Sequence, residues 1–280
     1  MKFSTLMIAG LATVAALSAV PASAKDWTKV SIGLEGAYPP WNLTNSDGTL
    51  GGFEPELIAD LCKRMNVECT LGAYDWDTMI ESLNAGKFDV IMDALSITPE
   101  RQQAIDFTIP YAATPTGFAV VKGSPLENMD GTGQTVKLTG DAATDKAEVE
   151  KLRAAFAGKT MGIQAATVYA SWAHANFPDT EIREYKTTAE RDLDLVAGRI
   201  DVGFDDATSF KAAFATPGNE DLEFTGPEIG GAVWGPGMGL GIRKSDTDLT
   251  AKFNTAIEAA LADGTVKTLS EKWFGLSIAP

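Results

Sequence analysis

Apolar and polar residues follow the strand period in some stretches of the chain and the helix period in others. Alternation over residues 29–34 and compact apolar runs over 70–74 and 88–92 predict strands. Between these runs, the apolar residues of 57–65 and 79–83 recur every three or four positions, as on the buried face of a helix. The order strand, helix, strand, helix, strand predicts a mostly parallel sheet with right-handed crossovers.

Polar residues and glycines mark the ends of these elements. Glu54 is expected to cap the first helix, and Pro55 is expected to open it. Asp77 is expected to cap the second helix, which should end at Gly86. The loop at 35–41 follows the first strand and holds too many prolines and glycines to continue it. This loop is a candidate binding edge.

The same order of elements occurs twice along the chain. Residues 85–90 and 197–202 share a helix end at glycine, a basic residue and a strand that carries an aspartate. Residues 31–33, with the polar loop after them, likewise correspond to residues 161–164. We therefore predict two similar α/β units whose strand ends face the same place, where a gap between them suits a small ligand.

The remaining segments fit this plan of two units. Residues 117–122 predict a strand that leaves the first unit, and 124–158 predict a polar surface excursion on the second unit, with a helix near 147–156. The glycine-rich segment at 235–241 is expected to return to the first unit. Two C-terminal helices, around 249–262 and 266–273, are expected to cover its sheet.

The first 24 residues have the three parts of a secretory signal peptide. Lys2 supplies the charged start, residues 6–20 supply the apolar core, and Ala22-Ser23-Ala24 supplies the cleavage site. A transmembrane anchor is the competing interpretation, but the apolar core is short and no stop-transfer pattern follows it. We therefore expect an exported protein made of residues 25–280.

The amino-acid composition excludes several classes of binding partner and of active site for such a protein. Acidic residues outnumber basic ones by 38 to 23, which gives a net charge of −15. Nucleic acids and anionic lipids are bound through basic patches, so neither is an expected partner. In an oxidising compartment, Cys62 and Cys69 predict a disulfide; a metal pair is the weaker alternative because His174 is the only histidine. A single histidine and no G-x-S-x-G motif argue against classical hydrolase triads.

Two glycine-containing motifs fail the spacing that phosphate binding requires. Gly158-Lys159-Thr160 ends like a phosphate loop, but Arg153 stands where that motif needs a glycine. The segment at 235–241 lacks the G-x-G-x-x-G spacing and precedes a strand rather than a helix. We therefore expect no nucleotide cofactor, and no metal site either.

Polar groups gather where the strand at 88–92 ends. Asp93, Ser96 and Thr98 follow that strand at its carboxyl end, where open α/β sheets bind ligands. Thr98 is expected to cap a helix whose first residue is Pro99. Arg101 then lies in the first turn, where a cation opposes the helix dipole. A bound carboxylate would compensate for this; the alternative is an ordinary surface arginine.

The residues Asp93-Ala-Leu-Ser-Ile-Thr-Pro-Glu-Arg101, followed by Ile105-Asp-Phe-Thr and Pro110-Tyr111, resemble the signature of the periplasmic solute-binding proteins that supply polar amino acids to ABC importers. The lysine/arginine/ornithine, histidine and opine binders are similar over almost the whole chain after the signal peptide. The resemblance implies an α/β fold of two lobes, each a mostly parallel sheet flanked by helices, joined by a two-segment hinge that closes around the ligand.

The resemblance also implies where the protein acts and with what. It implies a periplasmic monomer with no cofactor and no catalytic residue, whose partners are a small-molecule ligand and a membrane permease. The predicted bounds are 25–113 plus 237–280 for the first lobe, 117–228 for the second, and 113–117 and 228–237 for the hinge and crossover segments.

Several positions of the resemblance predict contacts with the head group of the ligand. Arg101 falls on the arginine that grips the α-carboxylate, and the backbone N–H groups of Ser96 and Thr167 complete this clamp. Asp206 falls on the carboxylate that receives the α-ammonium. Both Thr167 and Asp206 also suit a plain helix N-cap, Thr167 for a helix that starts at Val168.

Other positions predict contacts with the side chain of the ligand. The rings of Tyr38 and Trp76 are expected to enclose it, and Glu35 and Asp93 are expected to reach its distal end. Asp93 and Ala94 depart from the small hydroxyl residues that the lysine/arginine/ornithine binders carry there. The complete predicted set is Glu35, Tyr38, Trp76, Asp93, Ala94, Ser96, Arg101, Gln164, Thr167 and Asp206.

Charge favours a cationic ligand. Asp206 and Arg101 pair both charges of an amino-acid head group. Glu35 and Asp93 would then stay unpaired in a desolvated cleft, at a cost of several kcal/mol each. We therefore favour arginine, ornithine, lysine or an arginine-derived opine over a neutral polar amino acid. Two alternatives use the same scaffold: an enzyme similar to the cyclohexadienyl dehydratases, and a ligand-sensing domain of a receptor, although no span or signalling domain follows before Pro280.

Overall fold

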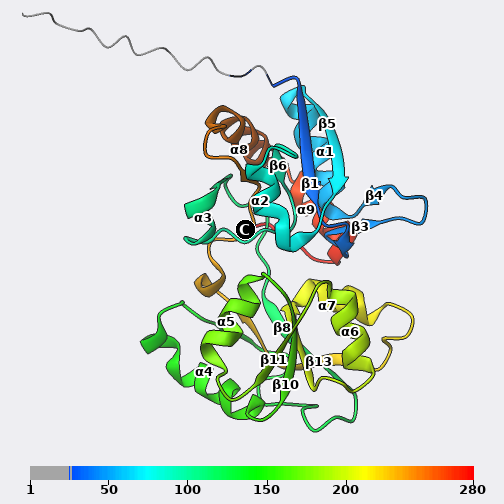
Figure 1. The fold of residues 1–280 in the computed structure, drawn as a ribbon, viewed down its shortest axis with the longest axis vertical. Coiled ribbons are helices and arrows are strands. Elements are labelled where there is room, and N and C mark those ends of the chain that lie inside the picture. Colours follow the sequence, from blue (N-terminus) through cyan, green and yellow to red (C-terminus); the bar gives the residue numbers. More distant parts are fainter. Residues whose placement is uncertain (1–24, 26) are drawn as a thin grey trace, which may run out of the picture.

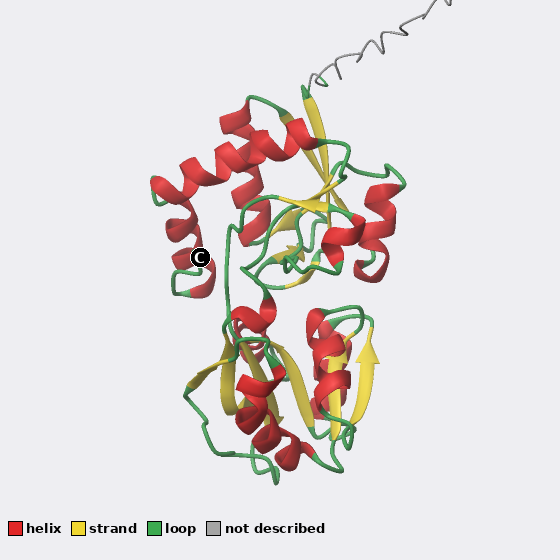
Figure 2. Cartoon of the chain, turned by 90° about the vertical axis from the view of Figure 1, so that its left-hand side faces the viewer, coloured by secondary structure: helices red, strands yellow, loops and turns green. Residues whose placement is uncertain are grey.

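The structure is a computed structural model that describes residues 25 and 27–280. The predicted signal peptide at 1–24 lies outside the described residues. Within residues 27–280, no helix is long and apolar enough to cross a membrane. The described chain forms two lobes, which lie one above the other in Figure 1 and are seen from the side in Figure 2. This confirms the predicted two-lobed α/β fold.

A five-stranded sheet in the order β5-β1-β6-β14-β7 forms the centre of the first lobe. Strands β5, β1 and β6 are parallel, and β14 enters from late in the chain to pair antiparallel with β6 and β7. Helices α1, α8 and α9 pack on one face of the sheet, and α2 packs on the other. The elements are β1 (Lys29–Leu34), α1 (Phe53–Met65), β5 (Glu68–Ala73), α2 (Met79–Asn84), β6 (Val90–Ile91), α3 (Arg101–Ala104), β7 (Asp106–Phe107), β14 (Gly241–Ile242), α8 (Thr247–Ala262) and α9 (Thr265–Phe274).

The second lobe has a six-stranded sheet in the order β11-β10-β12-β8-β13-β9. Strands β11, β10 and β12 are parallel, whereas β8 runs antiparallel to β12 and β13. Helices α4 and α5 pack on one face, and α6 and α7 pack on the other. The elements are β8 (Thr116–Val121), β9 (Thr135–Lys137), α4 (Ala142–Phe156), β10 (Thr160–Gln164), α5 (Val168–Asn176), β11 (Glu181–Tyr185), α6 (Thr188–Val196), β12 (Val202–Asp206), α7 (Ala207–Phe214) and β13 (Leu222–Gly230).

The sequence repeat has the same physical role in both lobes. Asp89 accepts the backbone N–H of Ser31 at 3.0 Å, and Asp201 accepts the N–H of Thr160 at 2.8 Å. Each aspartate thus fixes its own strand against the start of the neighbouring one. As a result, the polar loops that follow β1 and β10 leave the two sheets at equivalent points.

A small sheet of three short strands holds the loop at 35–41 in place. Strands β2 (Ala37–Tyr38), β3 (Asn42–Thr44) and β4 (Leu50–Gly51) pair antiparallel, and Gly52 then starts α1. Gly52 has φ of +118°, and a Cβ there would lie 2.5 Å from the carbonyl oxygen of Trp41, so glycine is required. Glu54 is therefore inside the first turn, fully buried, and the prediction that it caps the helix is wrong.

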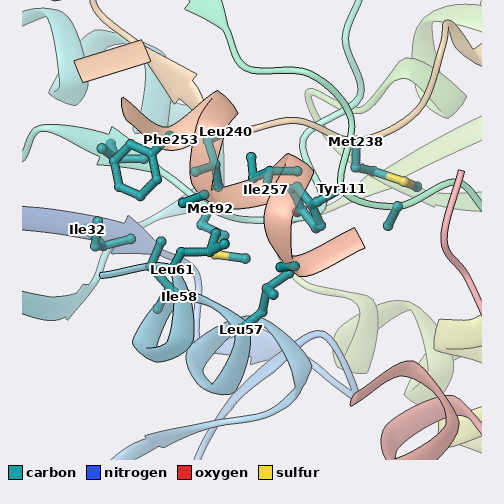
Figure 3. Packing of buried hydrophobic residues seen from close by; sticks show 14 of the residues in the cluster. Ile32, Leu57, Ile58, Leu61, Met92, Tyr111, Met238, Leu240, Phe253 and Ile257 are labelled. Atoms are coloured by element: carbon teal, nitrogen blue, oxygen red, sulfur yellow. The ribbon is translucent and has the colours of Figure 1, made fainter. Parts of the chain in front are cut away.

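Figure 3 shows how distant segments close the core of the first lobe. Leu57 and Leu61 of α1 meet Phe253 and Ile257 of α8 around Ile32 of β1. The last two helices therefore cover the first sheet, as predicted. Met238 and Leu240 belong to the same cluster, so the glycine-rich segment before β14 returns to this lobe.

Two predicted helix starts differ from the observed ones. Asp77 lies in a 3₁₀ turn, η1 (Trp76–Thr78), that leads into α2, and no side-chain cap precedes α2; the prediction that Asp77 caps it is wrong. Helix α3 begins at Arg101, later than expected, but the Thr98 hydroxyl still accepts the Arg101 N–H at 3.2 Å. The turn before Arg101 is thus held as the sequence predicts.

The predicted disulfide is present. Cys62 at the end of α1 is bonded to Cys69 in β5, with 6.2 Å between the two Cα atoms. The bond fixes the last turn of α1 to the edge strand of the sheet. It lies at the end of the sheet where β5 begins, away from the loops that follow the parallel strands.

Two segments connect the lobes. One runs into β8 at Thr116, and the other leaves β13 at Gly230 and passes through η2 (Ala232–Trp234). Met238 bridges to Ser96 and to Ala112, which ties the second segment to the first lobe. The lobe and hinge bounds given above stay our proposal.

Candidate functional site

A cavity lies between the lobes. Nine of the ten predicted site residues line it, and only Asp206 does not. Val168 and Tyr169, at the start of α5, also line it and were not predicted. The first lobe contributes Glu35, Tyr38, Trp76, Asp93, Ala94, Ser96 and Arg101, and the second contributes Gln164, Thr167, Val168 and Tyr169.

Arg101 is a half-buried cation without a carboxylate partner among the described residues. Its guanidinium donates to the carbonyl oxygens of Ser96 at 3.1 Å and Ala166 at 3.4 Å, and it lies 5.4 Å from the centre of the Trp76 ring. Burial lowers the pKa of Arg101 to about 10, so it remains charged at neutral pH. A guanidinium has five N–H donors, which leaves several that can bind an anion.

The start of α5 faces the same end of the cavity. Thr167 caps this helix: its Oγ1 accepts the N–H of Ala170 at 3.1 Å and donates to the carbonyl of Gln164 at 2.8 Å. The cap predicted from the sequence is therefore confirmed. Free backbone N–H groups at a helix start attract anions, so Arg101 and α5 together favour a carboxylate here.

Two aromatic residues of the first lobe reach across to the second. The hydroxyl of Tyr38 donates to Asp205 at 2.8 Å, and Nε1 of Trp76 donates to the carbonyl of Ala165 at 3.0 Å. Tyr38 is buried and Trp76 is half-buried, and both line the cavity. Their predicted contact with a ligand side chain stays a prediction; their contact with the opposite lobe was not foreseen.

Glu35 also connects the lobes. It accepts Nε2 of Gln164 at 2.9 Å, and that amide also donates to the carbonyl of Lys186. Burial raises the pKa of Glu35 to about 7, the hydrogen bond from Gln164 opposes this, and the charge of Asp205 adds to it. At neutral pH Glu35 is thus poised between its two protonation states.

Asp93 lies at the floor of the cavity, next to a second buried acid. One of its oxygens accepts Nδ2 of Asn42 at 2.6 Å, and the other, Oδ2, is buried without a hydrogen-bond partner in the described chain. The same Asn42 amide donates to Glu54 at 2.8 Å. Burial, then the charges of Glu54 and Glu35, raise the pKa of Asp93 well above its usual range.

Asp206 caps α7 rather than lining the cavity. Its carboxylate accepts the backbone N–H groups of Thr208 at 2.8 Å and Ser209 at 3.2 Å, and the hydroxyls of Thr208 and Thr114. Burial raises its pKa to about 6. The N-cap that the sequence predicted is confirmed, whereas its contact with an α-ammonium group stays a prediction.

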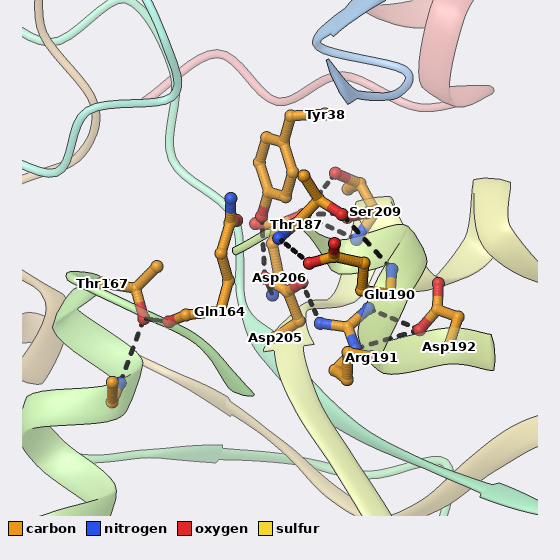
Figure 4. Close-up of polar contacts among 12 residues, drawn as sticks. Tyr38, Gln164, Thr167, Thr187, Glu190, Arg191, Asp192, Asp205, Asp206 and Ser209 are labelled. Carbon is orange, nitrogen blue, oxygen red and sulfur yellow. Dashed lines mark hydrogen bonds and ion pairs between the residues drawn. The ribbon is translucent and has the colours of Figure 1, made fainter. Parts of the chain in front are cut away.

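Figure 4 shows a buried ion cluster behind the cavity wall. Arg191 of α6 has no exposed surface and donates to Asp192 at 2.8 Å and to Asp205. Asp205 in turn accepts the hydroxyl of Tyr38. Sequence reasoning missed this cluster, although the paired acids at 205–206 after a buried strand were a usable signal. It also missed Asn42 and Glu54.

Within the part of the chain that the structure describes, five direct contacts hold the lobes together around the cavity. Four of these contacts are described above. The fifth is an ion pair between Lys186 and Asp75 at 2.9 Å. The contacts join several elements of one lobe to the other, so the structure corresponds to a closed arrangement. The pairs are Tyr38–Asp205, Trp76–Ala165, Glu35–Gln164, Arg101–Ala166 and Asp75–Lys186.

Comparison with known proteins identifies relatives of this chain in sequence and in fold. The sequence model of the bacterial extracellular solute-binding proteins, family 3, matches residues 30–276. An octopine-binding periplasmic protein of Rhizobium meliloti is 38% identical over all of both chains, and an L-arginine-binding protein of Pseudomonas aeruginosa is 31% identical over 98% of this chain and 97% of its own. A solved periplasmic His/Glu/Gln/Arg/opine family-binding protein from Silicibacter pomeroyi, in complex with lysine, is 32% identical, covers 90% of this chain and 99% of its own, and gives a TM-score of 0.71.

Proposed function

The chain belongs to the bacterial extracellular solute-binding proteins, family 3, and we propose that it captures a cationic amino acid or an arginine-derived opine in the cavity between its lobes. This family membership confirms the resemblance to periplasmic solute-binding proteins that the sequence of residues 93–111 indicated. As the solute-binding component of an ABC importer, the closed protein presents its ligand to a membrane permease. We propose that it does so in the periplasm, as a monomer.

The single observation that carries the ligand class is the set of ionisable groups at the cavity that have no ion-pair partner among the described residues. Arg101 binds only neutral carbonyl oxygens there, and Glu35 and Asp93 are acids without a cationic partner in the described chain. A molecule with a carboxylate at one end and a cation at the other satisfies all three. Closure around it is favourable because each lobe supplies part of the contact, so ligand binding shifts the protein toward the closed form.

An opine needs more room at the head group than an amino acid does, because its α-nitrogen carries an extra carboxylate-bearing group. A neighbouring hollow shares Arg101, Thr167 and Val168 with the central cavity and extends to Ser171. This hollow supports an opine as a ligand alongside arginine. The name of the relative from Rhizobium meliloti points the same way.

Calorimetric titration with a ligand panel tests the proposal. The panel holds arginine, ornithine, lysine, octopine, histidine and glutamine. We expect arginine or octopine to bind most tightly, with dissociation constants between about 1 μM and 1 nM, or about −8 to −12 kcal/mol. Asp93→Ser should weaken the cationic ligands more than glutamine. Preferential binding of glutamine by the unmodified protein would overturn the assigned ligand class.

One observation favours an enzyme as the second candidate. The pKa of Glu35, raised to about 7 in a closed cavity, suits a general acid or base. We propose binding without chemistry, because the named relatives are binding proteins. Prolonged incubation followed by mass spectrometry of the ligand decides between the two: recovery of intact arginine or octopine supports a binder, and a dehydrated or decarboxylated product supports an enzyme.

A further inference from the structure

Two carboxyl groups lie one behind the other under the cavity floor. Glu54 has no exposed surface and Asp93 is 3% exposed. The side-chain amide of Asn42 lies between them and donates to both, at 2.8 Å and 2.6 Å. Its own oxygen accepts the N–H of Gly36 at 2.7 Å, which fixes the orientation of the amide. Two acids that share one donor in a buried site cannot both ionise without a large cost in free energy.

Hydrogen bonding decides which acid carries the charge. Glu54 accepts three donors: the amide of Asn42, the N–H of Ala94 at 2.7 Å and the hydroxyl of Tyr111. Three donors to one carboxylate favour its ionised form. Burial still raises the pKa of Glu54, but these bonds oppose it. Glu54 is therefore the stronger acid of the pair.

Asp93 has the opposite surroundings. The side-chain amide of Asn42 donates to its Oδ1, and the backbone N–H of Glu35 also lowers its pKa, but Oδ2 is buried without a hydrogen-bond partner among the described residues. The charged or titratable groups around it are Glu54 from α1, Glu35 after β1, and Tyr111, which stays neutral because burial raises its pKa. The facing cation, Arg101, binds the carbonyls of Ser96 and Ala166 rather than Asp93.

We propose that Asp93 carries a proton while the cavity is empty and releases it to solvent when the cationic end of a ligand arrives beside Oδ2. The O–H bond of the carboxyl breaks, its electron pair stays on Asp93, and the proton goes to the buffer. The site thus exchanges one positive charge for another, and its net charge does not change. This inference rests on the proposed function, because it concerns the same cavity and its cationic ligand.

Because of this proton exchange, Asp93 distinguishes a cationic ligand from a neutral ligand of the same shape. Arginine and citrulline differ at the distal group, a guanidinium in one and a neutral ureido group in the other. Citrulline leaves the proton on Asp93, which then donates it to the ureido oxygen. Arginine binding becomes tighter as pH rises toward the pKa of Asp93 in the empty protein, by up to about tenfold per pH unit. Citrulline binding does not tighten in that range.

Titration calorimetry of the unmodified protein tests the exchange. Arginine and citrulline are each titrated in two buffers with different ionisation enthalpies, and the difference in heat gives the number of protons released. We expect arginine to release close to one proton more than citrulline. Equal proton release by the two ligands would overturn the proposal. If neither arginine nor octopine gives binding heat, the proposed function itself fails, and the two failures are thus distinguished.

Paired variants identify the group that loses the proton, since Glu35 also titrates near neutral pH. In Glu35→Gln the difference between arginine and citrulline should persist. In Asp93→Asn the difference in proton release between arginine and citrulline should fall to the part that Glu35 contributes. The reverse result, with the difference lost in Glu35→Gln and kept in Asp93→Asn, would assign the exchange to Glu35 and overturn the role of Asp93. Thermal unfolding of each variant confirms that it is folded before titration.

Discussion

Tyr38 of the first lobe donates its hydroxyl hydrogen to Asp205 of the second, with 2.8 Å between the two oxygens. The same tyrosine lines the ligand cavity, so one side chain contacts both the ligand space and the opposite lobe. Behind it, the fully buried Arg191 holds Asp205 in place. Closure of the lobes therefore brings Tyr38 against an acceptor that is itself paired with a buried arginine.

Replacing Tyr38 with phenylalanine removes this interaction and keeps the ring. A net hydrogen bond contributes about 1 kcal/mol, so the closed form should lose about fivefold in population relative to the open form. Calorimetry should then give a dissociation constant about fivefold higher for every ligand, with the order of preference unchanged. Tyr185→Phe is the matched control, because Tyr185 donates to Asp194 at 2.8 Å within the second lobe. An equal loss in both variants would argue against a role in closure.

Arg101→Lys keeps the charge but removes the planar fork of donors. Hydrogen bonds to charged groups contribute about 1.5 to 3 kcal/mol, so all ligands with an α-carboxylate should bind about 10- to 100-fold more weakly. Calorimetry with arginine measures the loss. Arg153→Lys is the control, since Arg153 donates to the carbonyl of Asn176, outside the central cavity. Unchanged affinity in Arg101→Lys would remove Arg101 from the carboxylate clamp.

Glu35 should make the closed form of the ligand-free protein less stable as pH rises. Burial raises its pKa in the folded state from 4.5 to about 7, so the folded protein binds more protons than the unfolded chain between these values. The stability from this group is complete below about pH 4.5 and is lost as pH passes through 7, by about 3 kcal/mol at most.

Chemical denaturation at pH values between about 5 and 8 measures this effect. Glu35→Gln should flatten the decline in the free energy of unfolding, whereas Glu258→Gln, at an exposed position of α8, should leave it as in the unmodified protein. A decline of the same size in Glu35→Gln would show that other groups cause it.

The disulfide should contribute to stability and not to binding. Linking Cys62 to Cys69 closes a short loop, for which about 2 to 3 kcal/mol is expected. Replacing both cysteines with serine should lower the free energy of unfolding by that amount in denaturant titrations. Affinity for arginine should stay the same, because neither cysteine lines the cavity. A loss of affinity without a loss of stability would contradict this assignment.

The sequence predicted the fold and most of the cavity because both depend on local signals. Arg101, Ser96 and Asp93 follow a buried strand, and the repeat of 85–90 at 197–202 placed the second unit beside the first. Glu54 was interpreted as a helix cap because its position before Pro55 suits one; its burial results from Gly52, whose conformation brings the start of α1 against Trp41. Only the folded chain shows this.

Contacts between the lobes could not be predicted from local pattern either. Asp205 meets Tyr38 only when the two sheets face each other, and nothing near either residue in the sequence specifies the partner. Asn42 is similar, because its two acceptors come from α1 and from the turn after β6. Such residues are visible as polar positions in the sequence, but their roles depend on the tertiary arrangement.

A crystal structure of the protein grown with arginine tests the central claim most directly. We predict the α-carboxylate on the guanidinium of Arg101 near the start of α5, and the ligand guanidinium within hydrogen-bond distance of Oδ2 of Asp93. Arginine bound in the reverse direction, or outside the cavity between the lobes, would contradict the account.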